Sequence, residues 1–348
     1  MSLPNAPTNS KSSVHLSIVT VSWNVWPLLK ASLRSIEEQS HPHPDDPELR
    51  YFDGDKTLEV VIVDSASSDE TVKQLPKTFP WVRLLASETN LGFTAGNNQG
   101  YAISKGEFIY FLNPDTAQVD DSFSGLYTVI ANDSTIGIVG PKLRYGDGTW
   151  QSSRRRFPTL LTGFLESTWL GQLWPTNPWA KHFLMDDSPT EQLDAQQDVD
   201  WLVGAAIMGR RTALETVRTT DAILYDGPFD EQFFMYSEEL DLGQRVKSAG
   251  WRVVYVPDAL VIHYEGRSSE QVITARHIRF NTSKVRYYKK YFGPVWASIL
   301  RHYLLFEFRL QGWIEGVKWL LGHKRELRAA RIASYREVIA SGLRPIER

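Results

Sequence analysis

The segment "FFMYSEELDLGQRVKSAGW" (233–251) contains the residues best suited to proton transfer, two adjacent glutamates. Its periodicity predicts a helix whose inner face carries Leu242 and Val246. Glu239 precedes these two residues by three and seven positions, so it shares their inward face. A carboxylate that faces a cleft can remove a proton from a bound hydroxyl group, and Glu239 is therefore the predicted general base.

The same segment indicates where the helix begins and ends. Ser237 is the predicted N-cap, and Gly250 is the predicted residue just after the last turn. Glu238 aligns with Asp241 and Arg245, nearer the flank of the helix, and is the second candidate for a catalytic carboxylate. Because acids in a first helical turn are favoured by the helix dipole, a purely structural explanation of the pair stays open.

Acid and amide side chains also stand where predicted strands end. Asn24, Asp64 and Asn113 follow apolar runs, and Asp115 comes directly after the bend at Pro114. Ligands of open α/β sheets bind beyond the carboxyl ends of the strands, so these side chains predict one shared polar pocket. For each of them alone, the ordinary preference of polar residues for turns is an equally good explanation.

The residue types at these strand ends suit different parts of a nucleotide. Asp64 can accept hydrogen bonds from a base N–H or a ribose hydroxyl, whereas Asp115 can bind a hard divalent cation. Such a cation would neutralise a diphosphate leaving group. His263, which ends the strand "ALVIH", is a second metal or phosphate ligand, and Arg267 and Ser268 can contact phosphate oxygens.

A glycine-rich stretch lies between two of these strands. "NLGFTAGNNQG" (90–100) contains three glycines and three asparagines in 11 residues. We expect a loop there, running into a helix that ends at Gly106, with a backbone that a ligand can approach closely. The stretch is neither a P-loop nor a G-x-G-x-x-G motif.

The elements that must position these residues alternate in the first half of the chain. Apolar segments predict strands at 16–23, 58–65, 81–87 and 107–113. A helix is predicted at 27–39, and a second helix after 65 with Ser67 or Ser68 as its N-cap. Apolar strands separated by helices are typical of a parallel sheet that is covered on both faces.

Composition excludes several classes of protein. The 348 residues carry a net charge of −3, so no global basic field indicates a nucleic-acid partner. There is no cysteine, which excludes disulfides, thiolate metal sites and cysteine nucleophiles. No stretch is long and apolar enough for a membrane-spanning helix. We expect a cytoplasmic protein, with the inner face of the cell membrane as a surface that it can touch.

The chain divides into three parts by character. Residues 1–13 predict a disordered tail and 14–270 a catalytic domain, within which 145–200 is an irregular lid or acceptor region rich in Trp and Pro. From 271 to 348 the chain predicts helices in which Arg and Lys alternate with aromatic residues. Two interpretations of these helices are equally good and compatible: packing within the chain or in a homodimer, and contact with an anionic membrane.

Taken together, these segments resemble the family 2 glycosyltransferases with the GT-A fold, and in particular their rhamnosyltransferase-like group. The resemblance covers about residues 16 to 290 and is carried, in order, by "VTVSWN", "VVIVDSASSDET", "NLGFTAGNNQG", "FIYFLNPDT", "DWLVGAAIMGRR", "FDEQFFMYSEELDLGQRVKSAGW" and "VIHYEGRSS". It implies an α/β GT-A nucleotide-diphospho-sugar transferase fold, with a Rossmann-like, mixed but mostly parallel sheet and a C-terminal helical extension.

The resemblance also assigns roles to residues. A dTDP- or UDP-sugar donor would contact Val21, Ser22, Asn24, Asp64, Asn90, Gly92, Asn97 and Asn113. Mg²⁺ or Mn²⁺ would bind Asp115 and His263, while Trp201, Gly204 and Asp241 would line the sugar and acceptor region. Asn113 stands where the family's D-x-D motif has its first acid, and Glu239 where the second acid of the carboxylate pair is commonly Asp.

The implied activity is transfer of a sugar, with rhamnose as the first choice, to a hydroxyl of a glycan or lipid-linked glycan in cell-surface polysaccharide synthesis. Glu239 would remove the acceptor proton, and attack in line with the leaving diphosphate would invert the anomeric configuration. Two alternatives stay open: a sugar nucleotidyltransferase, and a nucleotide-sugar or carbohydrate-binding module without catalysis. The segment "SWNVWP" after the first strand lacks the glycine-rich basic loop expected of a nucleotidyltransferase.

Overall fold

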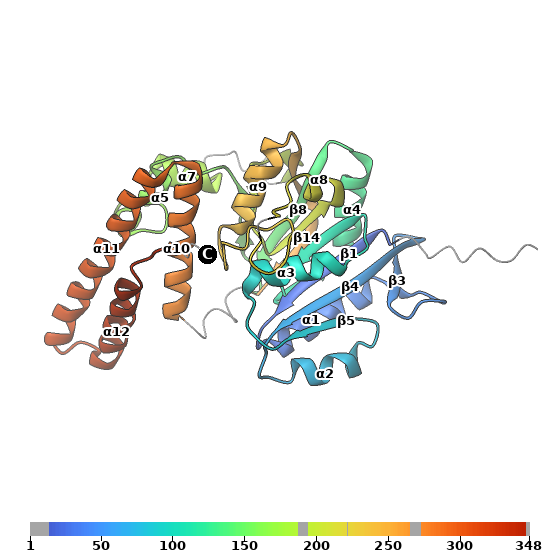
Figure 1. Cartoon of the computed structure of the whole chain (residues 1–348), viewed down its shortest axis with the longest axis horizontal. Coiled ribbons are helices and arrows are strands. Elements are labelled where there is room, and N and C mark those ends of the chain that lie inside the picture. Colours follow the sequence, from blue (N-terminus) through green and yellow to red (C-terminus); the bar gives the residue numbers. More distant parts are fainter. Residues whose placement is uncertain (1–13, 187–193, 221, 265–272, 346–348) are drawn as a thin grey trace, which may run out of the picture.

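The computed structural model describes residues 14–186, 194–220, 222–264 and 273–345. The predicted tail 1–13 and the predicted phosphate contacts Arg267 and Ser268 lie outside these ranges. Within them, 12 strands form one mixed sheet with the main order β11-β14-β8-β13-β6-β1-β4-β3-β2. A compact body around this sheet continues into an arm of helices at the C-terminal end (Figure 1).

The centre of the sheet is parallel and apolar. β1 (Leu16–Ser22) lies between β4 (Lys56–Ser65) and β6 (Phe108–Leu112), and it runs parallel to both. β5 (Arg83–Ser87) continues the parallel order on the other side of β4. The antiparallel β13 (Ala206–Arg210) then joins β6 to β8 (Ile136–Tyr145), and β14 (Arg252–His263) follows β8. The predicted strands are therefore present, in a mixed sheet.

The other strands are short and lie at the edges. They are β2 (His41–Pro42), β3 (Leu49–Phe52), β7 (Thr116–Val119), β9 (Trp150–Gln151) and β11 (Gln197–Asp198) in the sheet, and β10 (Arg154–Arg155) and β12 (Trp201–Leu202) as a separate pair. The hairpin of β2 and β3 was not predicted from the sequence.

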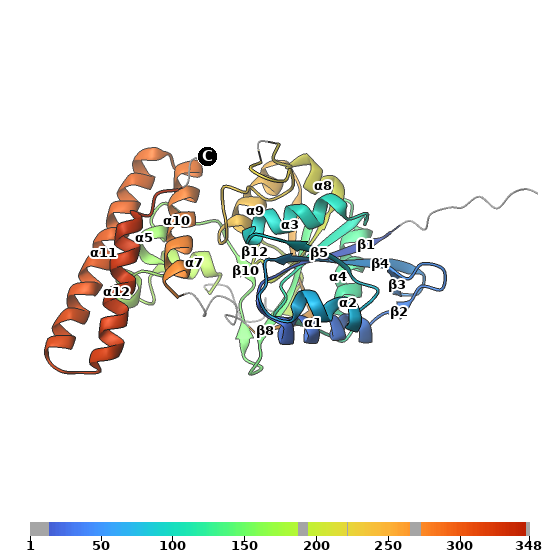
Figure 2. The same ribbon diagram turned by 60° about the horizontal axis from the view of Figure 1, so that its bottom comes forward.

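Helices cover both faces of the sheet, as predicted. One face packs against α1 (Trp26–Glu38), α2 (Thr71–Thr78) and α4 (Ser122–Asn132), and the other against α3 (Gly92–Ile103), α8 (Arg211–Thr216) and α9 (Glu238–Ser248). α1 places Leu29, Leu33 and Ile36 in the core because these residues recur at helical spacing. Figure 2 shows the sheet between these two layers.

The glycine-rich stretch is mostly helical and not a loop, because its glycines pack the helix tightly onto the sheet. A Cβ atom on Gly96 would lie 2.9 Å from Val21 of β1, and one on Gly100 only 2.4 Å from Val19. α3 therefore begins at Gly92 and approaches β1 more closely than a helix with larger residues could. The close approach that these glycines allow in the structure is that of α3 to β1.

The described part of the segment between β8 and β12, which the sequence predicted to be irregular, contains short helices. These are α5 (Thr162–Leu165), α6 (Trp169–Leu173) and α7 (Pro178–Leu184). Trp169 N donates a hydrogen bond to Glu307 of the C-terminal helices, 2.7 Å away, and Gly163 N donates one to Tyr288 Oη. Part of the predicted lid is thus attached to the C-terminal helices.

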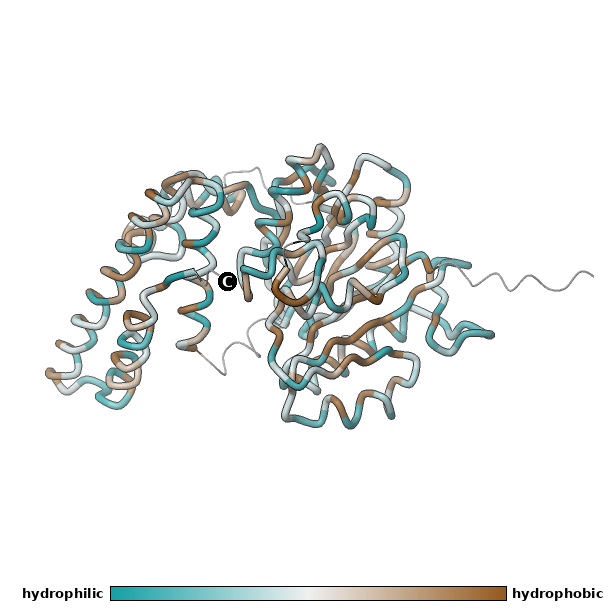
Figure 3. The backbone as a smooth tube through the Cα atoms, viewed as in Figure 1, coloured by the Kyte–Doolittle hydropathy of each residue, from teal (hydrophilic) through white to brown (hydrophobic). Residues whose placement is uncertain are grey.

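Three C-terminal helices form the arm: α10 (Ile273–Tyr291), α11 (Pro294–Leu320) and α12 (Arg325–Ser341). They share an apolar cluster with the body, in which Phe233 and Leu240 meet Tyr287 and Leu300. The tube coloured by hydropathy shows brown segments concentrated in the strands, with mixed colours along the arm (Figure 3). Among the described helices, none combines the length and apolar content needed to cross a membrane.

Candidate active site

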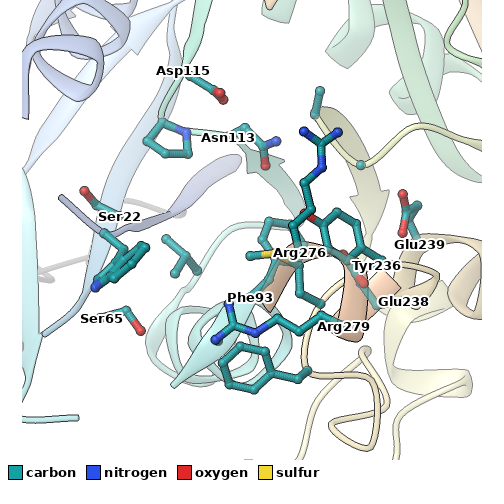
Figure 4. A pocket seen from close by; sticks show the side chains of 18 of the residues that line it. Ser22, Ser65, Phe93, Asn113, Asp115, Tyr236, Glu238, Glu239, Arg276 and Arg279 are labelled. Atoms are coloured by element: carbon teal, nitrogen blue, oxygen red, sulfur yellow. The ribbon is translucent and has the colours of Figure 1, made fainter. Parts of the chain in front are cut away.

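One pocket of about 310 Å³ opens at the carboxyl ends of β1, β4 and β6. Figure 4 shows Ser22 and Ser65 on one side, Glu238 and Glu239 on the opposite side, and Asn113 with Asp115 between them. Its lining includes ten predicted site residues: Val21, Ser22, Asn90, Gly92, Asn113, Asp115, Gly204, Glu238, Glu239 and His263. Strand ends, a glycine-rich helix and the α9 glutamates thus meet at one hollow.

Two unpartnered oxygens lie at the ends of β1 and β4, where Ser22 and Ser65 line the pocket. Ser22 and Asp64 are register partners on these parallel strands. Asp64 Oδ2 accepts a hydrogen bond of 2.8 Å from Ser67 N, whereas Asp64 Oδ1 and Ser22 Oγ are buried without a partner. Burial raises the pKa of Asp64, and the hydrogen bonds from Ser67 oppose that shift. A ligand N–H or hydroxyl would satisfy these oxygens.

The loops after β1 and β4 are tied together by Asn24. Its backbone N donates to Ser67 Oγ at 2.9 Å, and its Oδ1 accepts from Ser68 N at 2.7 Å. Asn24 itself has a φ of 54°, in the left-handed region that asparagine tolerates better than most residues. Ser67 and Ser68 thus bind Asn24, and the prediction that either caps α2 is wrong: the N-cap residue is Glu70, whose side chain makes no capping hydrogen bond.

Asp115 and His263 face each other at the middle of the pocket. His263 Nε2 lies 3.4 Å from Asp115 Oδ1, and both side chains are buried. Gln151 Oε1 lies 3.1 Å from His263 Nδ1, so an Nδ1–H tautomer leaves Nε2 open toward Asp115. Asn113 Oδ1 is buried nearby without a hydrogen-bond partner. These donors fit one divalent cation, although no cluster of three or more His, Cys, Asp or Glu suited to a metal occurs in the described residues.

The two glutamates begin α9 with contrasting surroundings. Withdrawal from water, and then the charge of Glu239, raise the pKa of Glu238 well above its ordinary value. Withdrawal from water also raises the pKa of Glu239, but hydrogen bonds from backbone N–H groups, including that of Gly204, and the positive charge of Arg155 oppose that shift. Glu239 is thus the more easily ionised of the two, and each keeps one buried oxygen, Oε2, unpartnered.

The predicted place of Glu238 needs correction. It does not lie on the flank of the helix, because only 5% of it is exposed and it lines the pocket beside Glu239. Tyr236 and Ser237 explain the difference, since both have positive φ angles, 71° and 64°. This left-handed entry turns the first residues of α9 toward the pocket, and such strain is typical of functional sites. Ser237 is the N-cap residue, but its side chain makes no capping hydrogen bond.

Five predicted residues are not part of the pocket lining. Asp64 precedes Ser65 in β4, Asn24 lies in the loop after β1, and Asn97 Nδ2 donates to Phe93 O within α3. Trp201 donates from Nε1 to Arg156 O and packs on Phe183, so it faces the arm. Asp241 is fully buried, and its carboxylate pairs with Arg245 and Lys290 and accepts from Tyr291 Oη.

The pocket also contains residues that were not predicted as site residues. Phe93, Phe234 and Tyr236 add aromatic surface, and α10 adds Arg276 and Arg279. The Arg279 guanidinium lies 4.4 Å from the centre of the Phe234 ring, and burial lowers its pKa. Neither arginine has an ion-pair partner among the described acids. Their spacing of three residues in "TARHIRF" is a signal that sequence analysis could have used, since it places both on one helical face.

A family model for "Glycosyl transferase family 2" matches residues 17–218, which is more than half of the chain. The chain belongs to glycosyltransferase family 2. Membership in this family, together with the mixed sheet and its two helical layers, confirms the predicted GT-A fold. The matched range ends before α9, so it does not include Glu238 and Glu239.

Among curated relatives, this family 2 glycosyltransferase is 32% identical over 227 residues to "N-acetylglucosaminyl-diphospho-decaprenol L-rhamnosyltransferase" of Mycobacterium tuberculosis, covering 62% of this chain and 69% of the relative. It is 28% identical over 184 residues to "Rhamnosyltransferase WbbL" of Escherichia coli, covering 50% and 61%. A solved mannosyltransferase from Pyrobaculum calidifontis, in complex with GDP-Man and Mn²⁺, is 17% identical, with a TM-score of 0.48 over 95% of this chain and 75% of that one.

Proposed function

We propose that this family 2 glycosyltransferase transfers rhamnose from a dTDP-sugar to a hydroxyl of a lipid-linked glycan, with inversion, in cell-surface polysaccharide synthesis. The names of two relatives, a rhamnosyltransferase that acts on a diphospho-decaprenol glycan and the rhamnosyltransferase WbbL, support the donor sugar, and the first also supports the acceptor class. In this proposal residues 14–270 form the catalytic domain, and the following residues form a helical extension.

The observation that carries the proposal is the order in which polar and ionisable groups follow one another along one pocket. At one end, Ser22 Oγ and Asp64 Oδ1 lack partners, which suits the N–H and carbonyl edge of a pyrimidine base. At the other end, Glu239 is the better ionised carboxylate. Asp115 and His263 lie between them. This is the order in which base, diphosphate and attacked carbon follow one another in a nucleotide-diphospho-sugar.

Asp115, His263 and Asn113 are the residues that would hold Mg²⁺ or Mn²⁺. Two protein ligands and one amide are too few to complete the coordination of such an ion, and Mg²⁺ sites commonly use substrate phosphates for the remainder. When bound, the cation would stabilise negative charge on the leaving diphosphate. Gln151 holds the His263 ring in its orientation, which is the role of an outer partner at a metal site.

Glu239 acts as the base in this mechanism. Its carboxylate accepts the proton of the acceptor hydroxyl while that oxygen attacks the anomeric carbon from the face opposite the diphosphate. General-base assistance of this kind contributes about 10²- to 10⁴-fold. Glu238, whose pKa is raised well above the ordinary value, stays protonated and avoids a second negative charge beside the base. It is then a hydrogen-bond donor that can orient the acceptor.

Arg276 and Arg279 bind phosphate oxygens of the donor in this proposal. Both line the pocket, and neither has an acidic partner among the described residues. The half-buried Arg279 guanidinium is poorly solvated without an anion, so a diphosphate would stabilise it through charge-assisted hydrogen bonds.

The first experiment is a panel of nucleotides and nucleotide sugars, measured by thermal shift with and without Mg²⁺ or Mn²⁺. A ligand that binds the folded state alone raises the unfolding temperature by mass action. We expect dTDP-rhamnose and dTDP with metal to give the largest shifts, and UDP compounds smaller ones. Failure of both dTDP and UDP compounds would contradict the proposal, and a preference for another nucleotide would correct the donor.

A further inference from the structure

The outer face of α11 carries an apolar stripe that no described part of the chain covers. We define the α11 stripe as Val295, Ile299, Phe306, Trp313, Val317 and Leu320. Successive gaps of 4, 7, 7, 4 and 3 residues keep all six on one face of a helix. Phe306, Trp313 and Leu320 are 61%, 69% and 70% exposed. The stripe runs the whole length of α11, which is about 40 Å for 27 residues.

The charges around this stripe are of one sign. Both acids of α11, Glu307 and Glu315, are buried, with 8% and 6% exposure. Glu315 pairs with Arg328 of α12, so it contributes no free negative charge to the surface. Arg309 and Lys318 are exposed on α11. The exposed acids of the arm, Glu326 and Glu337, lie on α12 and not on α11.

The turn that joins α11 to α12 has the same character. We call residues 319–325, "WLLGHKR", the arm tip. Leu321 is 79% exposed there, and the Arg325 guanidinium lies 5.3 Å from the centre of the Trp319 ring. Trp, Leu, Lys and Arg together are the residues that proteins place at the boundary between lipid chains and headgroups.

Net charge is divided unequally along the chain. Residues 273–345 contain 15 Lys and Arg and four Glu, a net charge of +11, whereas the whole chain carries −3, so the remainder carries −14. Two copies of the arm packed stripe against stripe would bring two such positive segments together. An anionic surface would instead attract the arm and repel the body, which orients the molecule with the arm toward that surface.

We propose that the α11 stripe and the arm tip dock on an anionic lipid surface, with α11 lying in the plane of the interface. The apolar side chains enter the boundary of the acyl chains, while Arg309, Lys318 and the cations of the tip contact the headgroups. Figures 1 and 2 both show α11 on the outer side of the arm, away from the sheet. The same arm supplies Arg276 and Arg279 to the pocket, so docking fixes the pocket relative to the lipid.

This inference does not depend on the proposed sugar donor. Lipid binding is measured without nucleotide, and donor binding is measured without lipid, so the two can fail separately. The experiment is co-sedimentation of the full chain with vesicles of phosphatidylcholine alone and of phosphatidylcholine containing phosphatidylglycerol. We expect binding to the anionic vesicles, at least tenfold weaker binding to the neutral ones, and release by high salt.

Three variants assign the binding to this surface. The stripe variant Ile299→Ser, Phe306→Ser, Trp313→Ser should lose at least tenfold in affinity for anionic vesicles. The charge variant Arg309→Gln, Lys324→Gln, Arg325→Gln alters exposed cations alone and should lose about fivefold per charge. The matched control Val72→Ser, Leu224→Ser alters exposed apolar residues of the body and should bind like the original chain.

Several results would overturn the proposal that the α11 stripe and the arm tip dock on an anionic lipid surface. Binding to neither vesicle, or equal binding to both, would overturn the proposal. So would a chain that runs in solution at twice its mass of 39.7 kDa and becomes monomeric in the stripe variant, because the stripe would then be covered by a second copy. If the stripe variant fails to fold, the charge variant decides: unchanged binding of that variant to anionic vesicles overturns the proposal.

Discussion

Glu238 and Glu239 are neighbours in the chain, yet the structure gives them different electrostatic surroundings. The N–H of Gly204 and the charge of Arg155 stabilise the ionised form of Glu239, whereas Glu238 has the charge of Glu239 beside it. Two like charges in one site push the pKa values of the pair apart. The pair therefore favours one ionised and one protonated carboxyl group over two ionised ones, which is the arrangement that a base and a hydrogen-bond donor require.

Glu238→Gln tests this difference through stability. A carboxyl group whose pKa is raised in the folded state favours folding when protonated, so its contribution is fully present below the unfolded-state value near 4.5 and is lost as the pH rises through the folded-state value. Each unit of upward shift removes about 1.4 kcal/mol. We expect Glu238→Gln to raise the unfolding temperature at pH 8 and to change it little at pH 4. A lower unfolding temperature at pH 8 would mean that the Glu238 carboxylate stabilises the fold.

Asp115→Asn tests the proposed cation site. With so few protein ligands, the cation should bind together with the nucleotide, so Mg²⁺ or Mn²⁺ alone should not shift the unfolding temperature while dTDP and metal together do. The variant should lose the metal-dependent part of dTDP affinity, about tenfold or more, and keep the metal-independent part. The control Asp55→Asn, on an exposed turn, should keep both. Metal dependence that survives in Asp115→Asn would contradict the assignment.

At the scale of elements, α3 positions much of the site. Its glycines allow close contact with β1, and its polar side chains hold the loop before α9: Thr94 Oγ1 donates to Phe233 O at 2.6 Å, and Asn98 Nδ2 donates to Phe229 O at 2.9 Å. The glycine-rich stretch thus helps to position Glu238 and Glu239, because α3 holds the loop that precedes α9. Its composition alone could not reveal this role, because the partners are 139 and 131 residues away in the chain.

Gly100→Ala is predicted to destabilise the chain despite the helix preference of alanine. The added Cβ would lie 2.4 Å from Val19 Cγ1 in a closely packed layer, and overpacking of this kind costs about 1–3 kcal/mol. Gly312→Ala on α11 is the matched control, since its Cβ would meet nothing within 4 Å and should stabilise by up to about 1 kcal/mol. Chemical denaturation of both variants measures this. Equal stabilisation by the two would contradict the packing role.

Local pattern predicted the strands that are apolar along their length and buried on both faces. The strands at 16–23, 58–65 and 107–113 appear within a few residues of their predicted ends, because apolar β-rich runs have few alternatives. Local pattern does not reach residues whose place depends on a distant contact. The resemblance implied that Trp201 and Asp241 line the sugar region, whereas in the structure Trp201 faces the arm and Asp241 pairs with Lys290 of α10.

At the scale of the whole molecule, α10 joins the arm to the pocket of the candidate active site. Its C-terminal part binds Asp241 through Lys290 and Tyr291, while its first turns place Arg276 and Arg279 at the pocket. A basic, aromatic C-terminal segment was evident in the sequence. That two of its arginines reach the strand ends was not, because this depends on how the arm packs against the body.

Arg279→Leu tests this connection. If the guanidinium binds donor phosphates, the variant should lose about tenfold or more in affinity for dTDP and little for thymidine, which has no phosphate. The salt dependence of dTDP binding should also become weaker. Leucine keeps contact with the Phe234 ring, so equal losses for dTDP and thymidine would indicate a packing role instead. Isothermal titration with both ligands gives the comparison.

The most direct test of the central claim is Glu239→Gln, measured for turnover and for donor binding in the same preparation. The claim is that Glu239 removes the acceptor proton across the pocket from the nucleotide. It predicts that sugar transfer falls by about 10²- to 10⁴-fold, while dTDP-sugar affinity and the unfolding temperature with bound donor stay near those of the original chain. Transfer at the original rate by Glu239→Gln would contradict it, as would an original chain that binds the donor and never transfers the sugar.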